Sequence, residues 1–185
     1  MIHQEIQAQD PSCHDPLSVT FRHAEPSDAK SLLMLMRKIS QQTDYLLSDT
    51  EEMTIDDQRR LIEQYLQQER CAMIVVECDG QFVGMGNLVA DRHPRLAHIA
   101  EIGISLVEEY WGYGIGSMLA EAMIDYARRH GIEAINLEVV SENERAVRLY
   151  RRLGFQTVGT LHRRLHQDAS DYYDTLIMER LLVDN

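Results

Sequence analysis

Three glycines at alternate positions, Gly112, Gly114 and Gly116, separate an apolar segment that ends at Val107 from a long amphipathic segment. Glycine allows main-chain paths that a Cβ would block, and it lets a ligand approach the backbone closely. The first turn of a helix offers free N–H groups and the positive end of the helix dipole. A strand, a glycine loop and a helix start therefore predict a binding site for a phosphorylated ligand.

The same glycines are compatible with other interpretations. A tight turn between a strand and a helix also uses glycine. A P-loop is excluded, because it needs a lysine followed by Ser or Thr, and Ser117-Met118 does not provide this pair. A dinucleotide-binding loop has a third glycine where Ser117 stands, but Glu138 lies at a suitable distance to bind a ribose, so this alternative stays open.

A carboxylate precedes the glycine loop on the predicted strand. In an extended segment, Glu101, Gly103 and Ser105 point to one face, and the mostly apolar residues between them point to the other. The small side chains of Gly103 and Ser105 leave open volume beside Glu101. A glutamate on a strand is most often a solvated surface residue. Its place just before the predicted phosphate site makes Glu101 a candidate general base.

The composition limits the class of protein. The chain has 185 residues, is 44% hydrophobic and carries a net charge of −12. This length suits one folded domain, and the charge favours a cationic substrate over a nucleic-acid or anionic-membrane surface. No apolar run reaches the roughly 20 residues that a membrane helix needs. The three cysteines lack metal-ligand spacing, so we expect no metal site and free thiols in a reducing cytoplasm.

Periodicity, caps and turn residues predict the elements that hold these residues. Residues 1–17 are polar and predict a weakly ordered leader, whereas residues 18–185 predict one domain. Asp79-Gly80 is a strong hairpin signal between two apolar segments. The predicted helices begin near Pro26, Thr54, Gly114 and Ser141. The predicted strands are residues 18–23, 71–77, 81–90, 98–107, 135–139, 155–164 and 172–182.

A second short motif follows the strand at residues 135–139. Ser141 and Glu144 have the spacing of a capping box, and Gly154 is placed to end the helix. Asn143, Ala146 and Tyr150 fall on roughly one face of this helix. A tyrosine in such a place is either a core residue or a functional hydroxyl.

Together the two motifs resemble the GCN5-related N-acetyltransferase (GNAT) superfamily. Residues 111–116, Trp-Gly-Tyr-Gly-Ile-Gly, resemble its pyrophosphate loop, Arg/Gln-x-x-Gly-x-Gly/Ala, with Trp111 in place of Arg or Gln. The second motif matches in order and interval through Asn143, Ala146, Leu149, Tyr150, Gly154 and Phe155. Residues 174–180 are similar to the family's last strand. The resemblance extends over residues 18–182 and is closest to bacterial members that act on small amines or amino acids.

The resemblance implies an α/β (α+β) fold, with a mixed, mostly antiparallel seven-stranded sheet flanked by about four helices. It implies a split between the strand that ends at Val107 and the parallel strand from Ala134, with acetyl-CoA in the split. The pantetheine arm is expected to pair with the backbone of Ile104 and Leu106. The remaining implied cofactor-binding residues are Trp111, Gly112, Tyr113, Gly114, Ile115, Gly116, Ser117, Asn143, Ala146 and Tyr150.

The implied reaction is transfer of an acetyl group from acetyl-CoA to a primary amine. The amine must be uncharged to react, so Glu101 is the candidate base, directly or through one water. Tyr150 is the candidate acid for the departing thiolate.

The implied acceptor is a small molecule such as an amino acid or a polyamine. Residues 41–53 and 161–173 are expected to form its site, with Asp44, Glu51 and Glu52 as candidate partners of a cation. Acetylation of protein N-terminal or lysine amines is one alternative, and a CoA-binding sensor without turnover is another. The resemblance is compatible with a homodimer that has no nucleic-acid or membrane partner.

Overall fold

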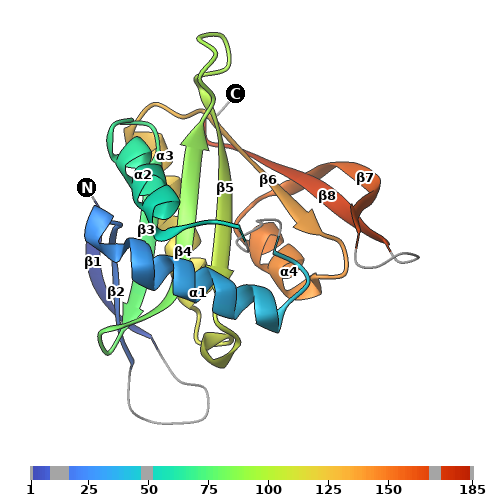
Figure 1. The fold of residues 1–185 in the computed structure, drawn as a ribbon. Coiled ribbons are helices and arrows are strands. Elements are labelled where there is room, and N and C mark those ends of the chain that lie inside the picture. The colour runs from blue at the N-terminus through green and yellow to red at the C-terminus, as the bar shows by residue number, and fades with distance from the viewer. Residues whose placement is uncertain (1, 9–16, 47–51, 167–171, 184–185) are drawn as a thin grey trace.

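One mixed sheet forms the centre of the protein in the computed structural model, which describes residues 2–8, 17–46, 52–166 and 172–183. In these residues the sheet has eight strands in the order β1-β2-β3-β4-β5-β6-β8-β7, and only β5 and β6 are parallel neighbours (Figure 1). The strands are β1 (His3–Ala8), β2 (Leu17–His23), β3 (Ala72–Cys78), β4 (Gln81–Ala90), β5 (Ile99–Leu106), β6 (Ala134–Val140), β7 (Gln156–His166) and β8 (Tyr172–Leu181).

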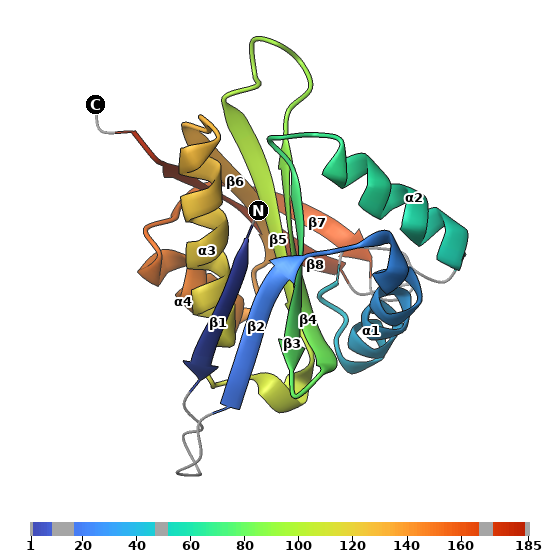
Figure 2. The same cartoon turned by 90° about the vertical axis from the view of Figure 1, so that its left-hand side faces the viewer.

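Helices cover both faces of this sheet. Figure 2 shows α1 (Ala29–Gln42) and α2 (Ile55–Leu66) on one face, and α3 (Ile115–Arg129) and α4 (Glu144–Arg152) on the other. The short 3₁₀ helices η1 (Pro26–Asp28) and η2 (Glu108–Tyr110) precede α1 and the glycine loop. Thr54 and Asp57 form the predicted capping box at the start of α2. No helix in the described part of the chain is long and apolar enough to cross a membrane.

The apolar core has two layers, because successive strand residues point to opposite faces of the sheet. Ile74 and Leu88 are fully buried in the layer that includes the apolar side of α3. Val75 and Met85 are buried in the layer that includes α1 and α2. Burying one such side chain stabilises the fold by about 1.5–3 kcal/mol. Both layers together hold β3, β4 and β5 as a rigid base for the residues near the glycine loop.

The parallel strands β5 and β6 pair over a short distance only. Residues Ile99, Ala100 and Glu101 of β5 pair with Ala134, Ile135 and Asn136 of β6. Beyond these pairs β5 continues to Leu106 and β6 to Val140, and Figure 1 shows the two strands diverging. β6 stays paired with β8 along its whole length. The predicted split is therefore present, and it opens toward the glycine loop.

The sheet confirms the predicted mixed, mostly antiparallel architecture with four α-helices in the described residues, but it has eight strands there rather than seven. The additional strand is β1, which lies inside the segment that the sequence predicted to be a weakly ordered leader. Ile2, which precedes β1, and Ala8, its last residue, are buried in the core. An edge strand tolerates polar residues, so β1 lacks the apolar alternation by which a central strand is recognised.

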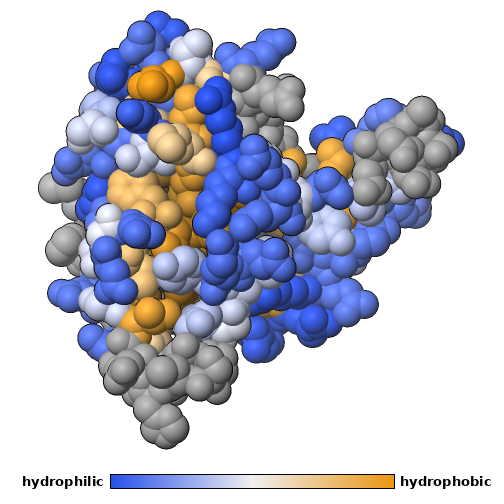
Figure 3. Space-filling view, turned by 60° about the horizontal axis from the view of Figure 1, so that its bottom comes forward, coloured by the Kyte–Doolittle hydropathy of each residue, from blue (hydrophilic) through white to orange (hydrophobic). Residues whose placement is uncertain are grey.

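The β7–β8 hairpin projects beyond the helices, and its side chains are mainly hydrophilic on the face shown in Figure 3. β7 is exposed along nearly its whole length. Near the turn end of the hairpin, where Tyr173 pairs with Leu165, the ring of Tyr173 contacts the ring of Tyr45 edge-on, with 5.7 Å between the centroids. This contact joins β8 to the segment that follows α1.

Candidate active site

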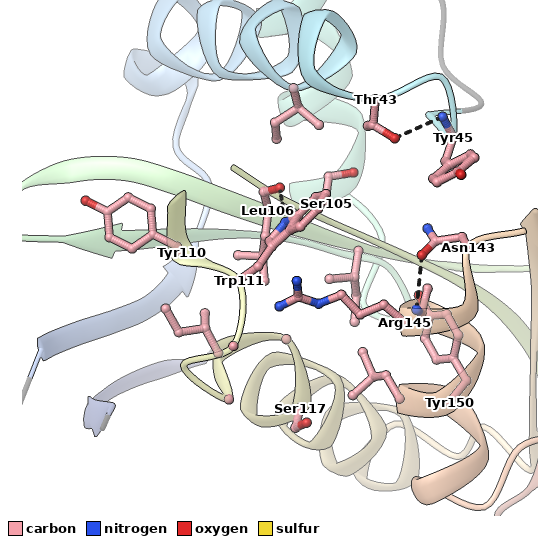
Figure 4. A pocket seen from close by; sticks show the side chains of 18 of the residues that line it. Thr43, Tyr45, Ser105, Leu106, Tyr110, Trp111, Ser117, Asn143, Arg145 and Tyr150 are labelled. Carbon is pink, nitrogen blue, oxygen red and sulfur yellow. Dashed lines mark hydrogen bonds between the residues drawn. The ribbon is translucent and has the colours of Figure 1, made fainter. Parts of the chain in front are cut away.

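A cavity of about 310 Å³ lies at the end of β5. It is bounded by the glycine loop, the first turn of α3, one side of α4 and the residues at the end of α1 (Figure 4). The structure brings most of the predicted cofactor-binding residues together here, namely Ile104, Leu106, Trp111, Gly112, Gly114, Ile115, Gly116, Ser117, Asn143, Ala146 and Tyr150. These residues come from two separate stretches of the chain, residues 104–117 and residues 143–150.

The glycine loop has a backbone that only glycine adopts easily. Gly112 has φ +92°, and Gly114, the N-cap of α3, has φ +79°. A Cβ at either position would meet no heavy atom of the protein within 4 Å, so packing is not the reason for glycine. The reasons that remain are the positive φ and the free approach of a ligand to the main chain. The N-terminal end of α3 faces this space and favours a negatively charged group.

The backbone polar groups of Ile104 and Leu106 face away from β4. The N–H of Val107 donates to the carbonyl of Val83, and such bonds alternate along an antiparallel pair. The N–H and C=O groups of Ile104 and Leu106 consequently point to the side where β6 has separated from β5. An extended chain that carries amides can pair with β5 on this side.

Trp111 closes part of this edge. Its indole Nε1–H donates to the carbonyl of Leu106 at 2.9 Å, which fixes the orientation of the ring. The guanidinium carbon of Arg145 lies over the ring, 4.7 Å from its centroid. The Leu106 carbonyl already has a donor, whereas the Leu106 N–H and both polar groups of Ile104 point to the open side.

Tyr150 lines the cavity from α4 and is only 6% exposed. Its ring packs edge-on against Phe155, with 5.6 Å between the centroids. Burial disfavours the phenolate and raises the pKa of Tyr150 to about 12. The hydroxyl is therefore protonated near neutral pH and can donate a proton or a hydrogen bond into the cavity.

Asn143, rather than Ser141, caps α4. The Asn143 side-chain oxygen accepts a hydrogen bond from the N–H of Ala146 at 3.1 Å. The Ser141 hydroxyl instead has two acceptors within reach of its single proton, the Glu142 carboxylate at 2.8 Å and the Asp174 carbonyl at 3.1 Å. The predicted capping box at Ser141 is thus wrong, because β8 supplies the partner of this serine. Asn143 has a structural role as well as a position on the cavity wall.

Four predicted site residues in the described part of the chain lie outside the cavity lining, namely Asp44, Glu52, Glu101 and Tyr113. Tyr113 packs against the core and against Tyr110, with 6.4 Å between the ring centroids. Glu101 is exposed and lies three residues before Ile104, roughly 10 Å away along the strand. It belongs instead to the last β5–β6 pair, where the split begins.

Several lining residues are not among the site residues that were predicted individually from the sequence. Thr43, Tyr45 and Leu46 follow α1 and belong to the polar stretch that was predicted as part of the acceptor site. Glu51 of that stretch lies outside the described residues. Arg145, Leu149 and Arg152 line the cavity from α4 at the spacing i, i+4, i+7 of one helix face. That spacing is visible in the sequence, but the choice of face depends on how α4 packs.

Acidic, cysteine and histidine side chains in the described residues form no group of three or more that could hold a metal ion. The charged side chains that line the cavity are Arg145 and Arg152. The cavity therefore combines cations, a helix N-terminus and an unpaired strand edge, and it ends near a buried tyrosine hydroxyl.

Comparisons with known proteins agree with this geometry. The model of the Acetyltransferase (GNAT) family matches residues 37–155. The spermidine N(1)-acetyltransferase of Escherichia coli (strain K12) is 34% identical over 106 residues, which cover 55% of this chain and 54% of that protein. The chain thus spans about half the length of that relative. The L-amino acid N-acetyltransferase AaaT of the same organism is 25% identical over 170 residues, covering 88% of this chain and 98% of that protein.

The solved structures include an acetyltransferase of the GNAT family from Streptococcus pneumoniae. It superposes with a TM-score of 0.84 at 28% identity and covers 89% of this chain and 99% of that one. The architecture described above is therefore shared along nearly the full length of that protein.

Proposed function

Because the chain belongs to the GNAT acetyltransferase family, we propose that it transfers the acetyl group of acetyl-CoA to the nitrogen of a small primary amine. The observation that carries the proposal is the split between β5 and β6, which leads from the glycine loop to Tyr150. The split presents unpaired backbone groups, a helix N-terminus and a proton donor in one cavity.

Each part of acetyl-CoA has a matching chemical group in this cavity. The N-terminal end of α3 and the loop at Gly112 and Gly114 suit the pyrophosphate. The N–H of Leu106 and the polar groups of Ile104 suit the amides of pantetheine, which would extend β5 as an added strand does. The thioester would then lie farther along the split, between Tyr150 and the last β5–β6 pair.

The proposed reaction is a direct acyl transfer. The amine nitrogen attacks the thioester carbonyl, a C–N bond forms, and the C–S bond breaks. Tyr150 gives its proton to the departing thiolate, and Glu101 accepts a proton from the amine through one water. The proton taken from the amine finally restores the tyrosine hydroxyl, so the protein is unchanged after one turnover.

The acceptor is proposed to be an amino acid or a polyamine, bound beside Tyr45. Tyr45, Leu46 and Thr43 line the end of the cavity, and Tyr173 supports the Tyr45 ring from β8. The net charge of −12 favours a cationic substrate. Relatives named for spermidine and for L-amino acids support an acceptor of this size. Peptide amines are the alternative acceptors.

A thiol-release assay on a panel of amines tests the proposal. The panel contains amino acids, polyamines and peptides with a free N-terminus or a lysine, and mass spectrometry identifies the product. We expect CoA release that depends on a small amine. Binding of acetyl-CoA without release for any amine would instead favour a CoA-binding sensor, and tight binding of NAD would favour the dinucleotide-binding alternative.

A further inference from the structure

The charge of the cavity is opposite to that of the protein. The chain carries a net charge of −12, yet the charged side chains that line the cavity are two arginines of α4. Arg152 lies at the far end of the helix, about 10 Å from Arg145 at 1.5 Å per residue. Arg145 is the one that adjoins the loop, because it lies over Trp111.

Arg145 differs from the neighbouring arginine on the same helix. Arg148 forms an ion pair with Glu144 at 2.7 Å and has no place in the cavity lining. No salt bridge to Arg145 is formed by any carboxylate in the described residues. Burial and the nearby charge of Arg148 lower the pKa of Arg145, and Glu108 opposes them more weakly. A cation in this setting is stabilised by an anion that enters the cavity.

Trp111 holds the guanidinium in position. The indole is fixed by its hydrogen bond to the Leu106 carbonyl, and the flat face of the ring attracts a cation. Figure 4 shows the Arg145 side chain reaching from α4 toward Trp111, above the start of α3. The planar guanidinium can donate two parallel hydrogen bonds to phosphate oxygens.

We propose that Arg145, positioned by the ring of Trp111, binds the pyrophosphate of acetyl-CoA and so selects for donors that carry it. This inference rests on the proposed function of the cavity. The loop residues Gly112 to Ser117 contribute no cationic side chain. Arg145 therefore supplies a positive charge from the opposite wall, in addition to the N–H groups of α3. Trp111 acts as a positioning residue, because it orients the arginine rather than the phosphate.

Calorimetry with three donors tests this role. Acetyl-CoA carries both the pyrophosphate and the 3′-phosphate, acetyl-dephospho-CoA lacks only the 3′-phosphate, and acetyl-pantetheine lacks both. We expect Arg145→Met to weaken the first two donors by a similar factor, about 10- to 100-fold, because a charge-assisted contact is lost. Affinity for acetyl-pantetheine is expected to stay the same. The matched control Arg148→Met is expected to keep all three affinities within about threefold.

Fluorescence provides a second readout, because Trp111 is the single tryptophan of the chain. Arg145→Met is expected to change the emission of the free protein, and Arg148→Met is not. Thermal melting confirms that the variants are folded, and Arg145→Lys serves as a milder variant that keeps the charge without the planar pair of donors.

Three results would overturn the assignment. The first is an unchanged affinity of Arg145→Met for acetyl-CoA. The second is an equal loss for acetyl-pantetheine, which would indicate a general disturbance of the cavity. The third is a loss for acetyl-CoA that is absent for acetyl-dephospho-CoA, which would move Arg145 to the 3′-phosphate. Failure of the unmodified protein to bind acetyl-CoA would contradict the proposed function itself, and it is measured separately in the same experiment.

Discussion

Glu101 and Asn136 form the last pair between β5 and β6 before the two strands separate. Side chains of paired residues lie on the same face of a sheet. The amide oxygen of Asn136 is buried there and has no hydrogen-bond donor among the described residues. It can therefore accept a hydrogen bond from a water held beside the Glu101 carboxylate. This relationship favours a base that acts through water at the start of the split.

Glu101→Gln is expected to lower kcat/KM for the small amine by roughly 10²- to 10⁴-fold, because the shape is kept and the proton acceptor is lost. In the profile of kcat/KM against pH, the decrease on the acidic side that is caused by protonation of Glu101 should disappear in this variant. Raising the pH should partly rescue the variant, since more amine is then already neutral. A stopped assay of kcat/KM against pH makes the measurement.

Glu138 provides the comparison for this experiment. It lies on the same strand and face as Asn136, and it accepts hydrogen bonds from Thr175 at 2.7 Å and Arg164 at 3.0 Å. These partners occupy the carboxylate, so we expect Glu138→Gln to keep the acidic limb. If instead Glu101→Gln is fully active and Glu138→Gln is impaired, Glu138 rather than Glu101 is the general base.

Tyr150→Phe is expected to keep the affinity for acetyl-CoA and to lower turnover by about 10²-fold or more, because the thiolate loses its proton donor. Burial raises the pKa of Tyr150 to about 12, so the hydroxyl remains protonated well above neutral pH. Turnover of the unmodified enzyme should therefore not fall between about pH 8 and about pH 10 on account of this residue. Single-turnover kinetics measure the chemical step, and an unchanged rate would remove Tyr150 from it.

Gly114→Ala is expected to weaken acetyl-CoA binding by about tenfold or more, because a methyl group enters the space through which the pyrophosphate approaches the backbone. Gly80→Ala is the matched control. Both glycines have positive φ, +79° and +75°, and a Cβ at either meets no atom of the protein within 4 Å. Both variants should lose about 1–3 kcal/mol of folding stability from backbone strain. Only Gly114→Ala should lose affinity in calorimetry, and equal affinities would contradict the site.

Asp28→Asn is expected to destabilise the fold by about 1–3 kcal/mol at pH 7, because the buried partner of Arg22 loses its charge. Asp28 is 9% exposed and forms a salt bridge with Arg22 at 2.7 Å. Burial alone raises the pKa of Asp28, but hydrogen bonds from Arg22 and the Glu25 N–H, together with the charge of Arg22, lower it overall.

A lowered pKa gives stability that is present above the unfolded value of about 3.9 and is lost as the pH falls through the folded value. The difference between Asp28→Asn and the unmodified protein should thus shrink below about pH 4. Denaturant unfolding at pH 7 and at a pH below about 4 measures this difference in the free energy of unfolding. Asp56→Asn, which affects an exposed i, i+3 pair with Arg59, is the control and should change stability little. If the difference in the free energy of unfolding is the same at both pH values, the ionisation of Asp28 does not contribute to the acid dependence of stability.

Local patterns in the sequence were sufficient for most of the elements and for much of the cavity. The Asp79-Gly80 signal predicts the β3–β4 turn, where both residues have positive φ. The glycine loop and the apolar spacing after Gly114 predict α3 and its N-terminus. Such features depend on turn chemistry and on the periods 2 and 3.6, which operate within a few residues of the chain.

The tertiary structure alone decided the features that depend on distant partners. β1 is recognised only by its pairing with β2, since an edge strand carries no clear apolar alternation. The contact between Arg145 and Trp111 joins two motifs that are 34 positions apart in the printed sequence, and Tyr45 meets the cavity only because α1 crosses the end of β5. Tyr113 and Glu101 have suitable residue types, yet side-chain direction and distance along the strand place them outside the cavity lining. Apart from β1, the sequence by itself therefore determined which segments are helix, strand and loop. Packing determined which of their side chains share one site, because neighbours in space are chosen by long-range burial and pairing.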